Sequence, residues 1–279
     1  MIKELKVNLY RLLRSKSPYV ILGILIFGSI LSAFVIKFCV DDPFGLLTAF
    51  KVDIVGAATT EAEQDSYESL AVSLDDLANT NCLSGVVGMN FCAELVFFLW
   101  SLVFALFVSG EFKSRFHVNH YSLNPNPAMI VFLEWITLCI VLVVTEIFCY
   151  LITLGLSVAL CSSFTFTDGL LMLKNGAFML GVMIAFASMA FMVAYLRKAS
   201  PLAIVLSALW CFGVFDLIFA LVQFWIPLSS NFDLKSFSTK IALNKMTTMN
   251  YVSGTATILL LAGIFLGVTL YVASKRDPY

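Results

Sequence analysis

Six apolar stretches, each about as long as a bilayer is thick, make up most of this 279-residue chain. A helix needs about 20 mostly apolar residues to cross about 30 Å of hydrocarbon. The mean hydropathy is +0.95 and only 13% of the residues are charged. The stretches therefore lack the polar face that a helix of a soluble protein presents to water. The sequence predicts an all-α membrane protein with six transmembrane helices at residues 19–38, 86–109, 128–158, 170–196, 201–226 and 252–273.

The stretch 128–158 is too long for one perpendicular crossing. We expect it to tilt, to begin in the cytosol, or to break near Gly155. Continuous apolar runs favour helices over a barrel, whose strands would alternate apolar and polar residues.

Basic residues set the expected orientation, because cytoplasmic loops carry an excess of lysine and arginine. With six spans, eleven basic residues fall on the side of the two chain ends and six on the opposite side. Both termini are therefore predicted to be cytoplasmic. The net charge of −1 gives no indication of nucleic acid as a partner.

The polar segments outside the spans differ in character. Residues 1–17 combine leucines at helical spacing with lysines and arginines, which predicts an amphipathic helix lying in the membrane interface. A basic cluster that only sets topology is the alternative. Pro18 permits a turn into the first span of a single transmembrane domain, residues 18–279. Residues 227–251 are expected to form an extracellular helix or hairpin that dips into the membrane without crossing it.

Residues 39–85 form a large acidic loop, predicted to be extracellular, with nine carboxylates and one lysine. Such a loop would attract a cationic peptide, or would serve only as a solvated cap. Cys39 and Cys82 bracket the loop. An oxidising face would allow a disulfide between them, but nothing in the sequence fixes their distance.

Three carboxylates within the spans, Glu94, Glu146 and Asp216, are candidates for a substrate or proton pathway. An acidic residue at mid-bilayer costs about 2.5–3.5 kcal/mol on insertion scales, so each is expected to face protein or water. Hydrogen bonding between helices is the structural alternative. Glu134 lies nearer the inner surface and is expected to be interfacial.

Several motifs are absent. The chain has no G-x-x-x-x-G-K-[ST] nucleotide loop, so any ATP and Mg²⁺ would be bound by a partner. It has no H-E-x-x-H or G-x-S-x-G motif, which argues against an enzyme. His117 and His120 have no third ligand nearby, so the sequence predicts no metal site. The first and last three spans show no convincing repeat, which disfavours an inverted-repeat transporter.

Taken together, the chain resembles a permease subunit of the type-2 ABC exporter family. The amino-terminal stretch 2–16 resembles the interfacial elbow helix of that family. The segment Ser109-Gly110-Glu111-Phe112-Lys113 is similar to the Gly-Glu and basic pattern that follows its second span, and residues 227–250 resemble its re-entrant helices. The chain departs from the family in its longer 39–85 loop and in Glu134, where many relatives have a basic residue.

The resemblance implies that the cytosolic loop 110–126 is a coupling helix that docks into an ATPase subunit. The residues that would transmit closure of the ATPases are Glu111, Phe112, Lys113, Arg115 and Phe116. It also implies two permease subunits, identical or paralogous, paired with two cytosolic ATPases in a bacterial plasma membrane. Small permeases for bacteriocin or lantibiotic export and immunity are the nearest in size, and the expected substrate is a peptide or another amphipathic molecule.

Other functional classes stay open at this point. A proton-coupled secondary transporter would use Glu94, Glu146 and Asp216 and need no ATPase. A toxin-immunity receptor would act through the acidic loop 39–85. A membrane enzyme would need two catalytic groups at one depth, and the sequence offers no such pair.

Overall fold

The computed structural model describes residues 2–14, 16–41, 80–114, 126–211, 214, 234–242 and 245–275. Within them the fold is all-helical, with a single isolated bridge between Cys82 and Thr165. Five of the described helices are long and apolar enough to cross a membrane, as expected for a multi-pass membrane protein. They are α2 (Lys16–Asp41), α6 (Glu94–Lys113), α8 (Pro127–Leu160), α9 (Gly169–Arg197) and α13 (Thr248–Lys275).

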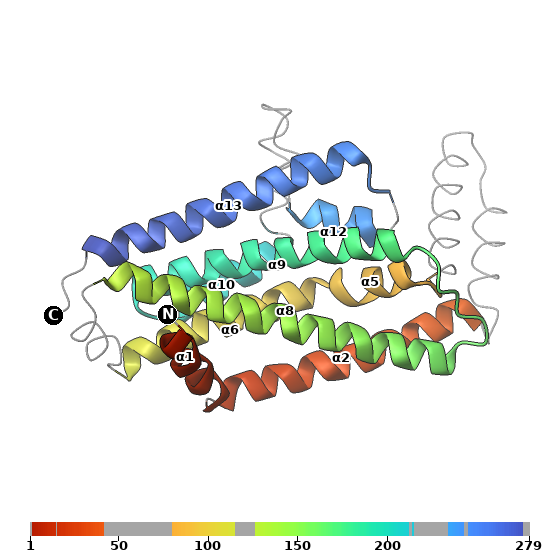
Figure 1. Cartoon of the computed structure of the whole chain (residues 1–279), viewed down its shortest axis with the longest axis horizontal. Helices are drawn as coiled ribbons and strands as arrows, with labels where there is room; N and C mark the ends of the chain where they lie inside the picture. Colours follow the sequence, from red (N-terminus) through yellow and green to blue (C-terminus); the bar gives the residue numbers. More distant parts are fainter. Residues whose placement is uncertain are drawn as a thin grey trace.

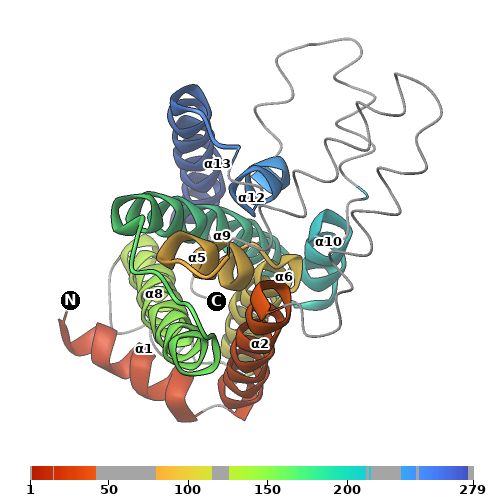
Figure 2. The ribbon, with the colours of Figure 1, turned by 90° about the vertical axis from the view of Figure 1, so that its right-hand side faces the viewer.

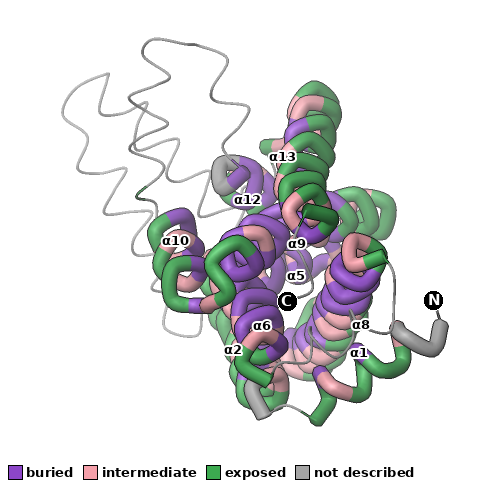
Figure 3. The backbone as a smooth tube through the Cα atoms, turned by 90° about the vertical axis from the view of Figure 1, so that its left-hand side faces the viewer, coloured by how far each residue is buried: buried purple, intermediate pink, exposed green. Residues whose placement is uncertain are grey.

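The amino-terminal helix α1 (Ile2–Arg14) has a different direction from the rest. Figures 2 and 3 look along the bundle and show α1 lying across it, while the long helices point toward the viewer. One face of this helix is buried, as at Asn8 and Leu12, and the other is exposed, as at Tyr10 and Leu13. The amphipathic helix expected at the amino terminus is therefore present, and it packs on α8 and α2.

The second predicted span is a broken helix, not a continuous one. Its outer part is the nine-residue helix α5 (Leu83–Phe91), and α6 begins at Glu94 after the two residues Cys92 and Ala93. The predicted span 86–109 missed this break. By contrast α8, 34 residues long, is continuous through Gly155, so the break that was one option for that span is absent.

The fifth predicted span, 201–226, is described only in its first part, as α10 (Pro201–Cys211) and Val214. Asp216 lies outside the described residues. In the segment 227–251 the structure has a short helix, α12 (Leu234–Ala242), followed by the start of α13. Leu234, Phe237 and Ile241 of α12 are buried, as their spacing predicts, whereas Ala242 is exposed.

The core of the bundle is formed mainly by α6 and α9, which pack on one another along their length (Figure 1). Figure 3 shows that buried residues are concentrated in these two helices and that α13 is largely exposed. One face of α2 is also exposed, including Phe27, Leu31 and Phe34. Large apolar side chains on an outer surface are what lipid, or another membrane subunit, would cover.

Candidate functional site

The break between α5 and α6 leaves main-chain groups outside a regular helix. The Cys92 N–H donates to the Gly88 carbonyl and the Val96 N–H to the Ala93 carbonyl, but no side chain caps the first turn of α6. Interrupted helices are tolerated at membrane depth where the freed groups face protein or a polar cavity. The residues around this break are therefore candidates for a functional site.

Three polar side chains from three helices meet beside the break. The hydroxyl oxygens of Ser29 on α2 and Thr153 on α8 both lie 3.3 Å from Oδ1 of Asn90 on α5. The Thr153 hydroxyl is also 3.1 Å from the Ser29 carbonyl oxygen. Ser29 is the twelfth of the 24 residues in the span Pro18–Asp41, which puts this contact halfway along that span.

Glu146 of α8 lies two turns from Thr153, and its side chain is almost completely buried. Its carboxylate accepts a hydrogen bond from the indole N–H of Trp100 on α6. No cationic side chain of the described residues forms an ion pair with it. We call Ser29, Asn90, Thr153 and Glu146 together the break cluster.

A cavity of about 190 Å³ is lined by Ser29, Asn90 and Glu146 of this cluster, but not by Thr153. Ser29, Ser32, Asn90 and Glu146 contribute its polar wall, and the remaining wall is apolar. Glu94, the first residue of α6, is half-buried, and its neighbours Ala93 and Leu95 line the same cavity. Of the three predicted pathway carboxylates, Glu146 lines this cavity, whereas Glu94 does not.

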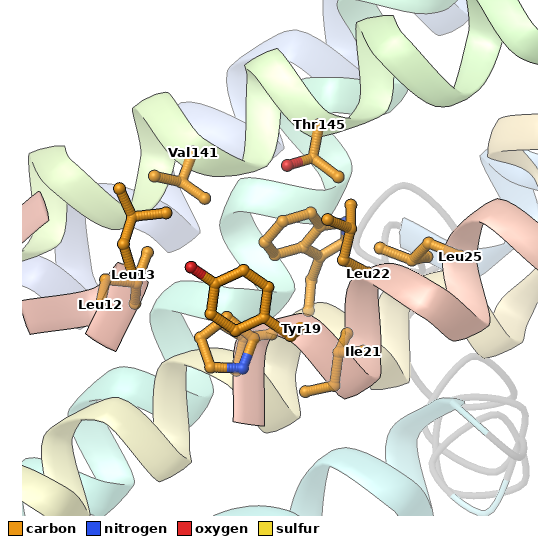
Figure 4. Close-up of a pocket in the computed structure, with 11 residues that line it drawn as sticks. Leu12, Leu13, Tyr19, Ile21, Leu22, Leu25, Val141 and Thr145 are labelled. Carbon is orange, nitrogen blue, oxygen red and sulfur yellow. The ribbon is translucent and has the colours of Figure 1, made fainter. Parts of the chain in front are cut away.

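A second cavity, of about 100 Å³, lies under the amphipathic helix (Figure 4). Leu12 and Leu13 of α1, Tyr19 and Leu22 of α2 and Val141 of α8 surround it, and nearly all of its wall is apolar. Leu25 and Trp100 line this cavity. Leu25 also lines the cavity beside the break, and the Trp100 N–H donates to Glu146. These two residues therefore separate an apolar space beneath α1 from the break cluster.

A group of charges connects α1 to the bundle. The Arg11 Nη1 atom lies 2.8 Å from Oε1 of Glu111 in the last turn of α6, and the guanidinium lies 5.8 Å from the centre of the Phe107 ring. Glu134 of α8 is fully buried and interacts electrostatically with both Glu111 and Arg11. We call Arg11, Glu111 and Glu134 the elbow cluster. Glu134 was expected at the interface, but it is enclosed by protein.

The predicted coupling residues do not share one environment. Glu111 is buried and paired with Arg11, so it does not lie on an open docking surface. Phe112 is half-buried, with its ring centre 5.5 Å from that of Tyr195. Lys113 is exposed. Arg115 and Phe116 lie outside the described residues.

The cysteines at the predicted extracellular end are thiols. Cys39 and Cys82 are not joined by a disulfide. Burial and the nearby Asp41 raise the pKa of Cys161, the residue that follows α8. A thiol with a raised pKa is a poor nucleophile, so this residue gives no sign of redox or catalytic chemistry. Within the described residues no group of three or more potential metal ligands occurs.

Sequence reasoning missed the Ser29–Asn90–Thr153 contact and the burial of Glu134. Asn90 within an apolar stretch was the available signal, because an amide at membrane depth requires partners. No protein-family model matches the chain, and no curated protein matches it. The two clusters, and the helices that hold them, are therefore the features that bear on function.

Proposed function

We propose that the chain is a permease subunit that moves an amphipathic substrate across a membrane and is driven by a separate ATPase subunit. The observation that carries this proposal is the ion pair between Arg11 and Glu111. It joins a helix lying across the bundle to the last turn of α6, which is also the start of the predicted coupling segment 110–126. A force applied at that loop would act on α1 and α6 together.

The path from the loop to the interior supports the proposal. The helix α6 has 20 residues, or about 30 Å at 1.5 Å per residue. One end carries the exposed Lys113, and the other end adjoins the break and the cavity beside it. The helix packs along α9, which keeps it rigid. Movement of the loop would therefore displace one wall of the cavity.

The charge distribution supports cytoplasmic termini. Lys113 and Arg197 end α6 and α9, and Lys275 ends α13. Figure 1 shows these three helix ends gathered at one end of the bundle, the end that α1 crosses. Because basic residues are retained on the cytoplasmic side, we propose that this end faces the cytosol, with a sixth crossing completed after α10. On the resemblance alone we propose a bacterial plasma membrane, a second permease subunit, and peptide export or immunity.

The test is purification of the tagged full-length chain from its native membrane, followed by measurement of Mg²⁺-dependent ATP hydrolysis. We expect the wild-type chain to bring an ATPase subunit with it and to hydrolyse ATP. Lys113→Glu should reduce both, because it reverses an exposed charge within the predicted coupling segment. The matched control is Lys275→Glu, an exposed lysine at the end of α13, which should keep both. Wild-type material without ATPase activity would overturn the proposal.

A second candidate, a proton-coupled transporter, is favoured by Glu146, a buried carboxyl that lines a cavity at membrane depth. It predicts proton entry into vesicles that contain the chain alone, reported by trapped pyranine and lost in Glu146→Gln. Vesicles that stay proton-tight would count against this candidate and leave the ATPase-driven one.

A further inference from the structure

The cavity beneath α1 has walls that suit an apolar ligand. It has a volume of about 100 Å³, and its lining side chains come from α1, α2, α6 and α8 (Figure 4). Among the described residues that line it, only Tyr19, Trp100 and Thr145 carry polar side-chain atoms, and the Trp100 N–H is already bonded to Glu146. Apolar cavities of this order of size stay free of water and bind apolar molecules. Hydrocarbon is therefore a better occupant of this cavity than water.

The cavity leads from the level of α1 toward the interior of the bundle. Leu13 and Tyr19 line it and are 50% and 55% exposed, whereas Leu25 and Trp100 line it and are buried. Pro18, another lining residue, begins the first span. Leu25 lies two turns further along α2, or about 10 Å at 1.5 Å per residue, and one leaflet of hydrocarbon is about 15 Å deep. A chain that entered beside α1 would thus run in the direction of a lipid acyl chain.

The charges on α1 indicate which headgroup such a lipid would carry. The helix lies across the bundle (Figures 2 and 3), as an amphipathic helix in the membrane interface does. Every charged side chain that the structure describes on α1 is basic, and Arg11 is paired with Glu111. Lys6 and Arg14 are exposed and form no ion pair within the described part of the chain. Because Arg14 directly follows the lining residue Leu13, this charge favours an anionic phosphate beside the cavity.

We propose that the cavity beneath α1 binds one acyl chain of an anionic phospholipid, whose phosphate is held by Arg14. The acyl chain would fill the space between α1, α2 and α8 and hold the amphipathic helix against the bundle. Because Trp100 also donates to Glu146, the same acyl chain would contact the residue that separates this cavity from the break cluster. Lipid binding is a property of the chain itself, so this inference does not depend on an ATPase partner.

The test uses a full-length chain in which Trp100 is the only tryptophan, because Trp135, Trp210 and Trp225 are replaced by phenylalanine. Trp100 is 3% exposed, so lipid outside the bundle makes little contact with it. The chain is placed in phosphatidylcholine vesicles with a rising fraction of dibrominated phosphatidylglycerol or of dibrominated phosphatidylcholine, whose bromine atoms quench a neighbouring indole. We expect the anionic lipid to reach half of its quenching at a fraction roughly fivefold lower or less, the effect of one basic residue at the surface.

A second readout needs no tryptophan replacement. Native mass spectrometry of the wild-type chain in detergent, with equal amounts of unbrominated phosphatidylglycerol and phosphatidylcholine added, counts the lipids that stay bound. We expect one phosphatidylglycerol to be retained in preference to phosphatidylcholine.

Two variants separate this cavity from general contact with lipid. Val141→Phe puts a larger side chain into the cavity wall and should abolish both the selective quenching and the retained lipid. Its matched control is Val144→Phe, the same change in the next turn of α8, at a position that is 61% exposed and does not line the cavity. Arg14→Gln should raise the fraction of anionic lipid needed by roughly fivefold. Its matched control is Lys275→Gln, an exposed lysine at the end of α13, which should leave that fraction unchanged.

Three results would each overturn the proposal. The first is equal quenching of Trp100 by the two brominated lipids together with no preferred lipid in the mass spectrum, which would indicate ordinary lipid contact. The second is a Val141→Phe variant that is quenched and retains lipid as its parent does. The third is an Arg14→Gln variant with an unchanged preference for the anionic lipid.

Discussion

The elbow cluster and the break cluster each bury carboxylates in apolar surroundings, yet they differ in how the charge is compensated. Two carboxylates of the elbow cluster, Glu111 and Glu134, share one guanidinium, that of Arg11. In the break cluster Glu146 has an indole N–H and a cavity. The first arrangement holds helices together, whereas the second leaves room for a ligand. The elbow cluster is therefore held by charge pairing, whereas the break cluster meets its carboxyl group with one indole N–H beside a cavity.

The largest expected effect is at Arg11. Arg11→Ala removes the guanidinium that pairs with Glu111, and breaking a buried pair in this way costs about 3 kcal/mol or more. We expect a fall of several degrees in the unfolding midpoint, measured by tryptophan fluorescence in detergent. The control is Arg14→Ala, an exposed arginine on the same helix, which should change the midpoint little. Equal effects of the two variants would contradict a structural role for the elbow cluster.

Next in size is Trp100→Phe, which removes the donor to Glu146. A hydrogen bond to a charged group contributes about 2 kcal/mol, so the unfolding midpoint should fall clearly. Trp135→Phe is a matched control, because its N–H donates to the neutral hydroxyl of Ser188 at 2.9 Å and should cost about half as much. Unfolding curves of the two variants, measured in parallel, test this order. A larger loss of stability in Trp135→Phe than in Trp100→Phe would count against a charged Glu146.

A smaller effect is expected for Thr153→Val, which removes the hydroxyl facing Asn90 and the Ser29 carbonyl. We expect a cost of about 1 kcal/mol. Thr137→Val provides the comparison: Thr137 is equally buried, but its hydroxyl bonds only the Leu133 carbonyl of its own helix. The difference between the two variants measures the contact between helices, and no difference would remove Thr153 from the break cluster.

The smallest expected change in stability is at Glu134, and the direction of this change is what tests the elbow cluster. Glu134→Gln removes the repulsion between two buried carboxylates while keeping the shape, so stability should rise by up to about 1 kcal/mol. Glu111→Gln should have the opposite sign, since it weakens the pair with Arg11. Unfolding midpoints of the two variants at pH 7 test this, and a stabilising Glu111→Gln would reverse the assignment of the paired carboxylate.

Apolar length and helical spacing were sufficient to predict much of the fold. The five long helices fall on predicted spans, and the buried Leu234, Phe237 and Ile241 follow the predicted spacing. The break in the second span was not predictable from the usual signals, because residues 91–94 contain no proline or glycine. The break lies beside tertiary contacts of Asn90 with two other helices, which a local sequence pattern does not contain.

The candidate site was predicted only in part, for a similar reason. Glu146 and Glu94 were recognisable as charges within apolar stretches. Ser29 and Thr153 were not, because single hydroxyls are common in membrane helices and usually bond their own helix. Likewise, the burial of Glu111 and Glu134 follows from the way α1 folds back over α6 and α8. Hydropathy reports how deep a residue lies along a span, but not which neighbouring helix it faces.

The length of α8 has one more consequence. Its 34 residues extend about 51 Å at 1.5 Å per residue, far more than the hydrocarbon needs. Because α1 contacts it near Glu134, the first turns of α8 lie beyond the level at which α1 would rest among lipid headgroups. An amphipathic helix lying at the interface would therefore fix the depth at which the bundle sits in the membrane. In bilayers of different thickness, the length that projects from the surface would then be set by the protein and not by the lipid.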